Sequence, residues 1–111
     1  MTTVYKDVYL IGKKLPKADK LGLHTLLQNK ILSVLENAVS AAFCDAHHKK
    51  PYLEKIRTLL EVGKHLLRTE NELGIITEST YIRIAKLLIE ASRMNAGWLK
   101  NTDERTKNSL F

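Results

Sequence analysis

The chain has 111 residues, a length that suits a single domain, and 44% of them are hydrophobic, which is enough to form a core. Lysine and arginine number 18 against 12 aspartates and glutamates, and the net charge of +6 favours a polyanionic partner. No apolar run reaches the ~20 residues of a membrane span, the first segment lacks a cleavable signal, and the single cysteine cannot form an internal disulfide, so we expect a cytoplasmic protein with no membrane contact.

The first half of the chain predicts two helices. The first, about 3–15, has apolar residues at helical spacing, namely Val4, Val8, Ile11 and Leu15. The second, about 16–45, begins at Pro16, because the first helical position does not need the N–H that proline lacks. Its core-facing residues are Leu23, Leu27, Ile31, Val34, Ala38 and Ala41.

Two further helices follow. The third, about 51–73, begins at Pro51 and ends before Gly74, which suits the left-handed position just past a helix. Thr77 then caps the fourth helix, about 78–100. Because short connections make neighbouring helices antiparallel, we predict an all-α, up-down-up-down four-helix bundle over residues 1–100 and a flexible C-terminal tail over 101–111.

The second and fourth helices carry more apolar residues than one bundle face requires. The surplus forms either a wide core face with scattered exposed side chains or a subunit interface. We favour homo-oligomerisation. The residues expected at the interface are Leu32, Leu35, Val39, Ile82, Ile89, Gly97 and Trp98.

Trp98, the only tryptophan, follows Gly97 near the predicted end of the fourth helix. It could pack within or between subunits, or stack on a nucleic-acid base. Packing is favoured, because single-strand binding platforms commonly use several aromatic residues and this chain has few.

The sequence offers no catalytic constellation, phosphate-binding loop or metal motif, so we expect no enzymatic activity, no cofactor and no metal. Cys44 precedes His47 and His48, but it follows an apolar helix and is expected to be a buried structural residue. Two adjacent histidines in a loop fall short of the three or four ligands of a metal site. Glu70 and Glu72, two apart on a helix, do not face each other and are expected to be solvated.

Cations recur at helical spacing on the third and fourth helices. The two predicted stripes comprise Arg57, Lys64 and Arg68, and Arg83, Lys86, Arg93 and Lys100. Such ridges either neutralise nucleic-acid phosphates or form ordinary solvated faces supported by neighbouring glutamates. Four lysines around the start of the second helix, Lys13, Lys14, Lys17 and Lys20, add to the first interpretation.

The segment "KKLPKADKLGLHTLLQNKILSVLENAVSAAF", 13–43, resembles the second helix of the four-helix-bundle proteins encoded in intervening sequences of 23S ribosomal RNA genes. The segment "ELGIITESTYIRIAKLLIEASRMNAGWLK", 72–100, is similar to the last helix of a branch of that family, the accessory variability determinants of diversity-generating retroelements. The ending of that helix is matched by Arg93, Ala96, Gly97, Trp98, Leu99 and Lys100. Ala91-Ser92 and Asn95 depart from the family pattern.

The resemblance implies a homopentameric barrel of bundles with a basic surface. The retroelement branch implies association with a reverse transcriptase and with RNA or cDNA during mutagenic reverse transcription, without chemistry of its own. An oligomeric protein–protein scaffold without direct nucleic-acid binding is the alternative.

Overall fold

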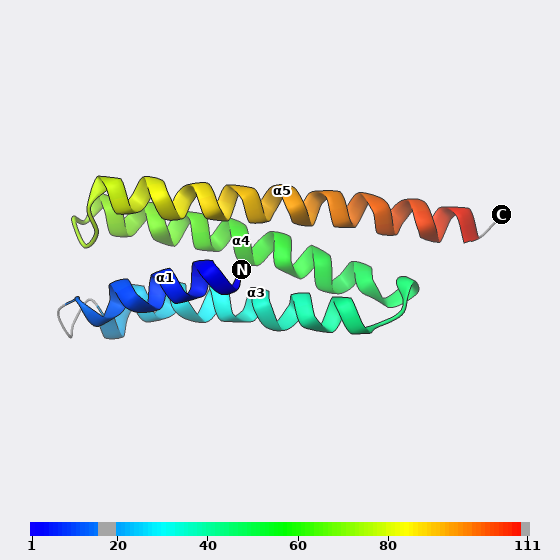
Figure 1. The fold of residues 1–111 in the computed structure, drawn as a ribbon, viewed down its shortest axis with the longest axis horizontal. Coiled ribbons are helices and arrows are strands. Elements are labelled where there is room, and N and C mark those ends of the chain that lie inside the picture. The colour runs from blue at the N-terminus through cyan, green and yellow to red at the C-terminus, as the bar shows by residue number, and fades with distance from the viewer. Residues whose placement is uncertain (16–19, 110–111) are drawn as a thin grey trace.

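The computed structural model describes residues 1–15 and 20–109, and the side chains of 1–15 and 22–105. Within these ranges all regular secondary structure is helical. The elements are α1 (Thr2–Lys13), a short π-type turn η1 (Lys20–His24), α3 (Thr25–Phe43), a 3₁₀ turn η2 (Ala46–His48), α4 (Lys49–Glu72) and α5 (Glu78–Ser109). Consecutive helices run in opposite directions and pack into an elongated bundle of 56 × 20 × 18 Å (Figure 1). The predicted all-α bundle is confirmed.

The start of the predicted second helix differs from the structure. The regular helix α3 begins at Thr25, and η1 before it contains a kink at Gly22, whose ψ of −114° is not helical. Glycine tolerates this conformation because it has no Cβ. Pro16, the predicted first residue of that helix, lies outside the described residues.

Helix α4 begins two residues before the predicted Pro51, at Lys49. Pro51 therefore occupies the third helical position rather than the first. This position still falls within the first turn, where backbone N–H groups have no intrahelical acceptor, so the ring costs no hydrogen bond.

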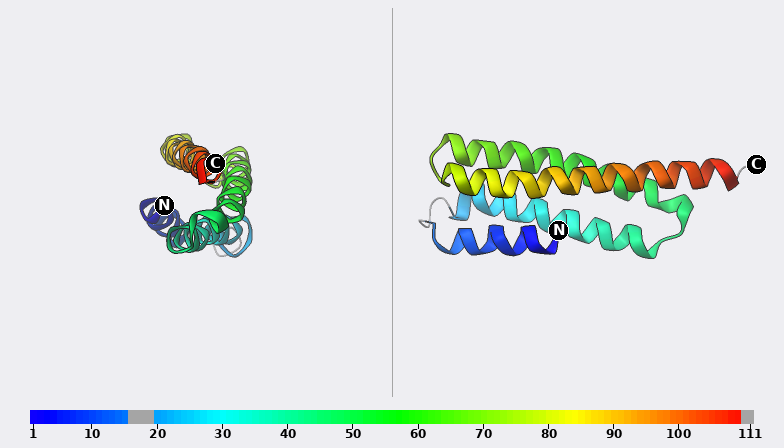
Figure 2. Two further views of the ribbon diagram at one scale, coloured as in Figure 1. Left: turned by 90° about the vertical axis from the view of Figure 1, so that its right-hand side faces the viewer. Right: turned by 45° about the horizontal axis from the view of Figure 1, so that its top comes forward.

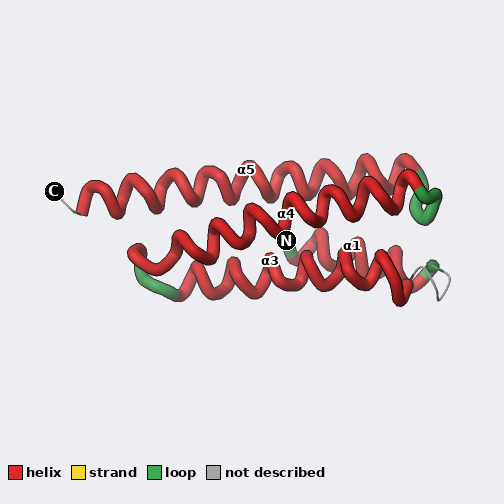
Figure 3. The backbone as a smooth tube through the Cα atoms, turned by 180° about the vertical axis from the view of Figure 1, so that it is seen from behind, coloured by secondary structure: helices red, strands yellow, loops and turns green. Residues whose placement is uncertain are grey.

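The predicted break between α4 and α5 is confirmed. Gly74 has a φ of +73°, and its N–H donates to the Asn71 carbonyl while that of Ile75 donates to the Glu70 carbonyl at 2.9 Å. This is the hydrogen-bond pattern of a Schellman ending. The Thr77 hydroxyl accepts from the Thr80 N–H at 3.2 Å and so caps α5. Figure 3 shows this loop and the α3–α4 loop at opposite ends of the bundle.

Helix α5 continues beyond its predicted end near residue 100. Residues 101–109, assigned to a flexible tail in the prediction, extend the helix to Ser109, and Thr102 is buried within it. No glycine or proline follows Gly97, so the sequence contains no strong helix terminator there.

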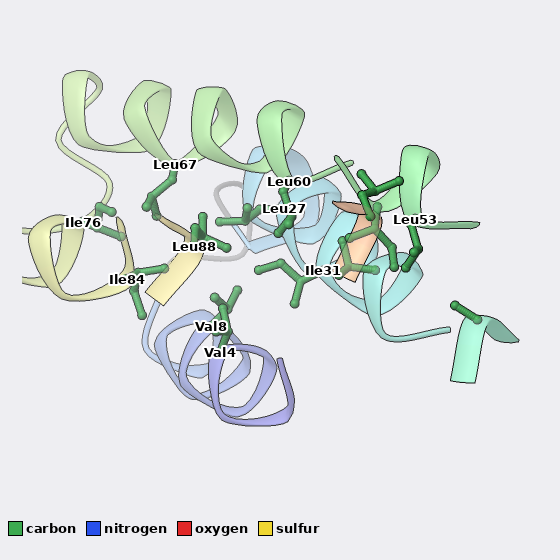
Figure 4. Packing of buried hydrophobic residues seen from close by; sticks show 14 residues of the cluster. Val4, Val8, Leu27, Ile31, Leu53, Leu60, Leu67, Ile76, Ile84 and Leu88 are labelled. Atoms are coloured by element: carbon green, nitrogen blue, oxygen red, sulfur yellow. The ribbon is translucent and has the colours of Figure 1, made fainter. Parts of the chain in front are cut away.

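The core consists mainly of the predicted helical stripes. Buried residues from all four helices meet along the bundle axis, with Val8, Leu27, Ile31, Leu60 and Leu88 directed toward one another (Figure 4). On α4 the five residues Leu53, Ile56, Leu60, Gly63 and Leu67, which recur at helical spacing, are buried.

Helix α1 is much shorter than the helices it packs against. It has 12 residues, whereas α3 has 19 and α5 has 32. Seen down the axis, the helices lie on an arc with α1 and α5 at its two ends, and the side view shows α1 stopping midway along α3 (Figure 2). Past the N-terminal end of α1, the described residues pack as three helices, α3, α4 and α5.

Candidate functional site

A buried polar cluster joins α1, η1 and α4. The imidazole of His24 lies with Nδ1 2.9 Å from Oε1 of Glu70 and Nε2 2.7 Å from the Val8 carbonyl oxygen. Both side chains are almost completely buried. Glu70 was predicted to be solvated, and this is wrong, because its carboxylate faces the bundle interior. Glu72 is exposed as predicted.

The hydrogen bonds of His24 fix where its protons lie. A carbonyl oxygen only accepts, so Nε2 carries a proton toward Val8. Nδ1 then either donates to an ionised Glu70 or accepts from a protonated one. Burial opposes the charged imidazolium, but the hydrogen bonds to Glu70 and Val8 and the charge of Glu70 outweigh it and raise the pKa of His24 above its usual 6.5.

Gly12 provides the space for this imidazole. A Cβ placed on Gly12 would lie 2.8 Å from Cδ2 and 3.0 Å from Nε2 of His24. The ring therefore packs directly against the backbone of α1. In consequence the position of α1 depends on a polar contact as well as on the apolar core.

A second buried polar residue, Asn95, joins α5 to α4. Its Nδ2 donates to the Leu53 carbonyl oxygen at 3.0 Å, while its Oδ1 and the hydroxyl of Ser92 are buried without a hydrogen-bond partner among the described residues. Both residues line a cleft of about 520 Å³ between α4 and α5.

The α4–α5 cleft holds two of the predicted nucleic-acid-binding cations, Arg57 and Lys100. It also holds carboxylates, and Arg57 forms an ion pair with Glu54. The other acidic residues that line it are Glu61, Asp103 and Glu104. Carboxylates therefore outnumber cations in this cleft, which on its own is a poor anion site.

The other two cations of the predicted α4 stripe lie further along the same side of the helix. Lys64 and Arg68 line a smaller hollow with Ile89 of α5. Lys64 donates to Glu61 at 2.9 Å, and this hydrogen bond lowers the pKa of the Glu61 carboxyl. Arg68 is exposed and forms no ion pair with the described residues.

The cations of α5 differ in their surroundings. Arg83 lies 3.4 Å from Asp7 of α1 and lines a cleft with Lys14, while Arg93 lies 3.4 Å from Glu90. Lys86 and Lys100 are exposed and form no ion pair within the described range. Three cations of the two predicted stripes thus form no ion pair among the described residues, namely Arg68, Lys86 and Lys100, although Lys100 shares the α4–α5 cleft with carboxylates.

The predicted lysine cluster around the start of the second helix is described only in part. Lys13 lies over the ring of Tyr9, 5.2 Å from its centroid, at the end of α1. Lys17 and the side chain of Lys20 lie outside the described residues.

Much of the predicted interface is exposed in the single chain. Leu32, Val39, Ile82 and Ile89 are exposed, and Leu35 is half-buried. Trp98 is half-buried and packs against the core, so it contributes to packing within the chain. Around Gly97, an added Cβ would meet none of the described atoms within 4 Å, so no contact that the structure describes requires a glycine there.

The Cys44 region shows a different arrangement from a thiol–imidazole pair. Cys44 is half-buried rather than buried, because it ends α3, and its thiol lies 3.5 Å from the Ala41 carbonyl oxygen. His48 instead contacts Asp45 at 2.6 Å, and His47 is exposed. Within the described residues there is no group of three or more side chains arranged to hold a metal ion. None of the described helices is long and apolar enough to cross a membrane.

The sequence did contain a signal for the buried pair. Continuing the α4 core stripe by three residues from Leu67 reaches Glu70, and stepping back three from Leu27 reaches His24. An ionisable base and an acid at the ends of two core stripes, here His24 and Glu70, indicate a buried polar pair. Interpreting Glu70 only by its spacing from Glu72 missed this.

Comparison of the chain with family models, with curated proteins and with solved structures yields no match.

Proposed function

We propose that the chain is a non-enzymatic accessory protein of a diversity-generating retroelement, which assembles with itself and binds a reverse transcriptase and RNA or cDNA through a basic surface. The observation that carries this proposal is that α5 exposes large apolar side chains and unpaired cations along one long helix. The residues concerned are Ile82, Lys86, Ile89 and Lys100. The resemblance described above supplies the identity of the polymerase partner.

Self-association is supported by the exposed apolar residues of α3 and α5. Val39 and Ile89 are each 50% exposed, and Leu32 and Ile82 lie on the same two helices. Apolar surface of this kind, spread along two helices, is typical of an interaction site. The family resemblance favours five subunits.

The assembly is tested by light scattering during size-exclusion chromatography. We expect a mass near five times the 12.6 kDa chain, and Val39→Glu with Ile89→Glu should yield a folded monomer, because a buried carboxylate at an interface is costly. Leu10→Glu is the control, since Leu10 is 54% exposed on α1 and outside the predicted interface. A monomeric wild-type chain at both low and high salt would contradict self-association.

Nucleic-acid binding is supported by the net charge of +6 and by exposed cations without carboxylate partners. We expect Lys86→Glu with Lys100→Glu to weaken binding of single-stranded RNA, because two phosphate contacts are lost. The slope of log K against log salt should fall by about 1.4, at about 0.7 per contact. Fluorescence anisotropy over a salt series measures both quantities.

The matched control separates local contacts from total charge. Lys6→Glu with Lys55→Glu changes two exposed lysines outside the predicted site, and both double variants carry the same net charge of 6 − 4 = +2. Equal losses in the two variants would mean that only overall charge matters, and would reject the α5 surface as a site.

A scaffold that docks on proteins without direct nucleic-acid contact is the second candidate. The ion pairs of Arg57, Lys64 and Arg93 with carboxylates favour it, because they reduce the charge available to phosphates. Docking that persists at high salt in the Lys86→Glu, Lys100→Glu variant would support the scaffold.

A further inference from the structure

The three-helix part of the bundle contains an apolar groove. It lies beside the N-terminal end of α1, where Met1 and Thr2 line it. The groove has a volume of about 470 Å³. Figure 2 shows α3 and α5 extending past the end of α1 on either side of this track.

The lining of the groove is suited to an apolar helix face. Ile56 and Leu60 of α4 form its floor, and the α3 and α5 walls bear no charged side chain. The wall residues are Val34, Leu35 and Ala38 of α3, and Ala91, Met94, Asn95 and Trp98 of α5. Met94 is 68% exposed, so part of this apolar lining remains open to solvent.

The far end of the groove is positively charged. Trp98 also lines an adjoining hollow with Lys49 and Arg105, and none of the described residues that line this hollow is acidic. The Lys49 ammonium lies 5.8 Å from the centre of the Trp98 ring and donates to the Ala41 carbonyl oxygen at 2.7 Å. An occupant with carboxylates at this end would complement Lys49 and Arg105.

We infer that this groove is the docking site for an amphipathic helix of a partner protein, whose acidic end lies against Lys49 and Arg105. The stretch of α5 from Ala91 to Arg105 spans 14 residue steps, or about 21 Å at ~1.5 Å per residue. A partner helix of about 14 residues would thus restore the fourth helix of the bundle along this stretch. The inference does not depend on the nucleic-acid binding proposed above.

The polarity of the groove also suggests the orientation of the partner helix. A helix C-terminus carries a partial negative charge, so it is favoured next to the two cations. Asn95 lines the groove with its Oδ1 unpaired among the described residues. That oxygen is itself buried, so it does not serve as a contact for the partner helix.

Trp98 makes the test direct, because it is the only tryptophan and it lines the groove. The probe is a synthetic amphipathic peptide of about 14 residues with leucines at helical spacing and two glutamates in its last turn. Titrating it into the full chain should shift Trp98 emission to the blue and saturate. A peptide with two lysines in place of the glutamates should bind several-fold more weakly.

Paired variants locate the binding. Met94→Gln with Ala38→Gln should weaken peptide binding several-fold without changing net charge, whereas Val62→Gln should not, since Val62 is exposed but does not line the groove. RNA affinity should be unchanged in both variants, which separates this inference from the proposed function.

Three outcomes would overturn the inference. Absence of saturable binding in the folded chain would show that the groove accepts no helix. Equal binding of both peptides would reject an acidic partner. Conversion of a self-assembled chain to a monomer by the Met94→Gln, Ala38→Gln variant would show that a second copy covers the groove.

Discussion

Glu70→Ala is expected to lower the free energy of unfolding by about 3 kcal/mol, because it leaves the buried imidazole of His24 without its carboxylate partner. Removing one member of a buried ion pair costs about 3–5 kcal/mol, and the lower end applies because His24 can release its proton. Urea denaturation followed by circular dichroism measures the change. A loss below about 0.5 kcal/mol, the scale of ordinary surface substitutions, would contradict the burial of the pair.

Glu70→Gln is the matched variant for the same site. A glutamine amide can donate to Nδ1 of a neutral His24 that keeps its Nε2 proton toward Val8, so both hydrogen bonds survive. We therefore expect a loss of about 1 kcal/mol, less than for alanine.

The two variants should also differ in pH dependence. The folded-state pKa of His24 is raised above 6.5, so the stability that protonation contributes is complete below about 6.5 and is lost as pH rises through the folded-state pKa. The wild-type melting temperature should fall over that range, and Glu70→Gln should remove this component. The difference between the two profiles isolates His24, because the exposed His47, His48 and His65 are the same in both proteins.

Gly12→Ala is expected to destabilise the fold by about 1–3 kcal/mol, although alanine is the better helix former. The new methyl group would lie 2.8 Å from Cδ2 of His24, whose ring is held on both sides by Glu70 and Val8 and cannot move aside freely. Thermal unfolding followed by circular dichroism measures the loss.

Gly97→Ala is the control and should have the opposite sign. Gly97 is an exposed helical glycine with no atom near its would-be methyl group, so alanine should add about 0.5–1 kcal/mol. If it instead weakens self-association, another subunit's backbone approaches Gly97 as the sequence suggested. If Gly12→Ala stabilises the chain as much as Gly97→Ala does, the packing of His24 against α1 is not as described.

The helices and their breaks follow from the sequence, because these features depend on local interactions. The positive φ of Gly74, the Thr77 cap and the buried stripe from Leu53 to Leu67 depend on backbone conformation and on spacings within one helix. Boundaries were less accurate at Gly22, where a kink shortens α3, and near residue 100, where α5 continues.

The pairings between helices were decided by the tertiary structure. His24 and Glu70 are 46 positions apart, and Arg83 and Asp7 are 76 positions apart. Spacing within one helix therefore does not show which of these residues pairs with which. Whether a cation is free for phosphates depends on which carboxylate the neighbouring helix brings to it, as with Lys50 and Asp103. The apolar groove has the same origin, because only the packing of α3, α4 and α5 shows which of their side chains α1 leaves uncovered.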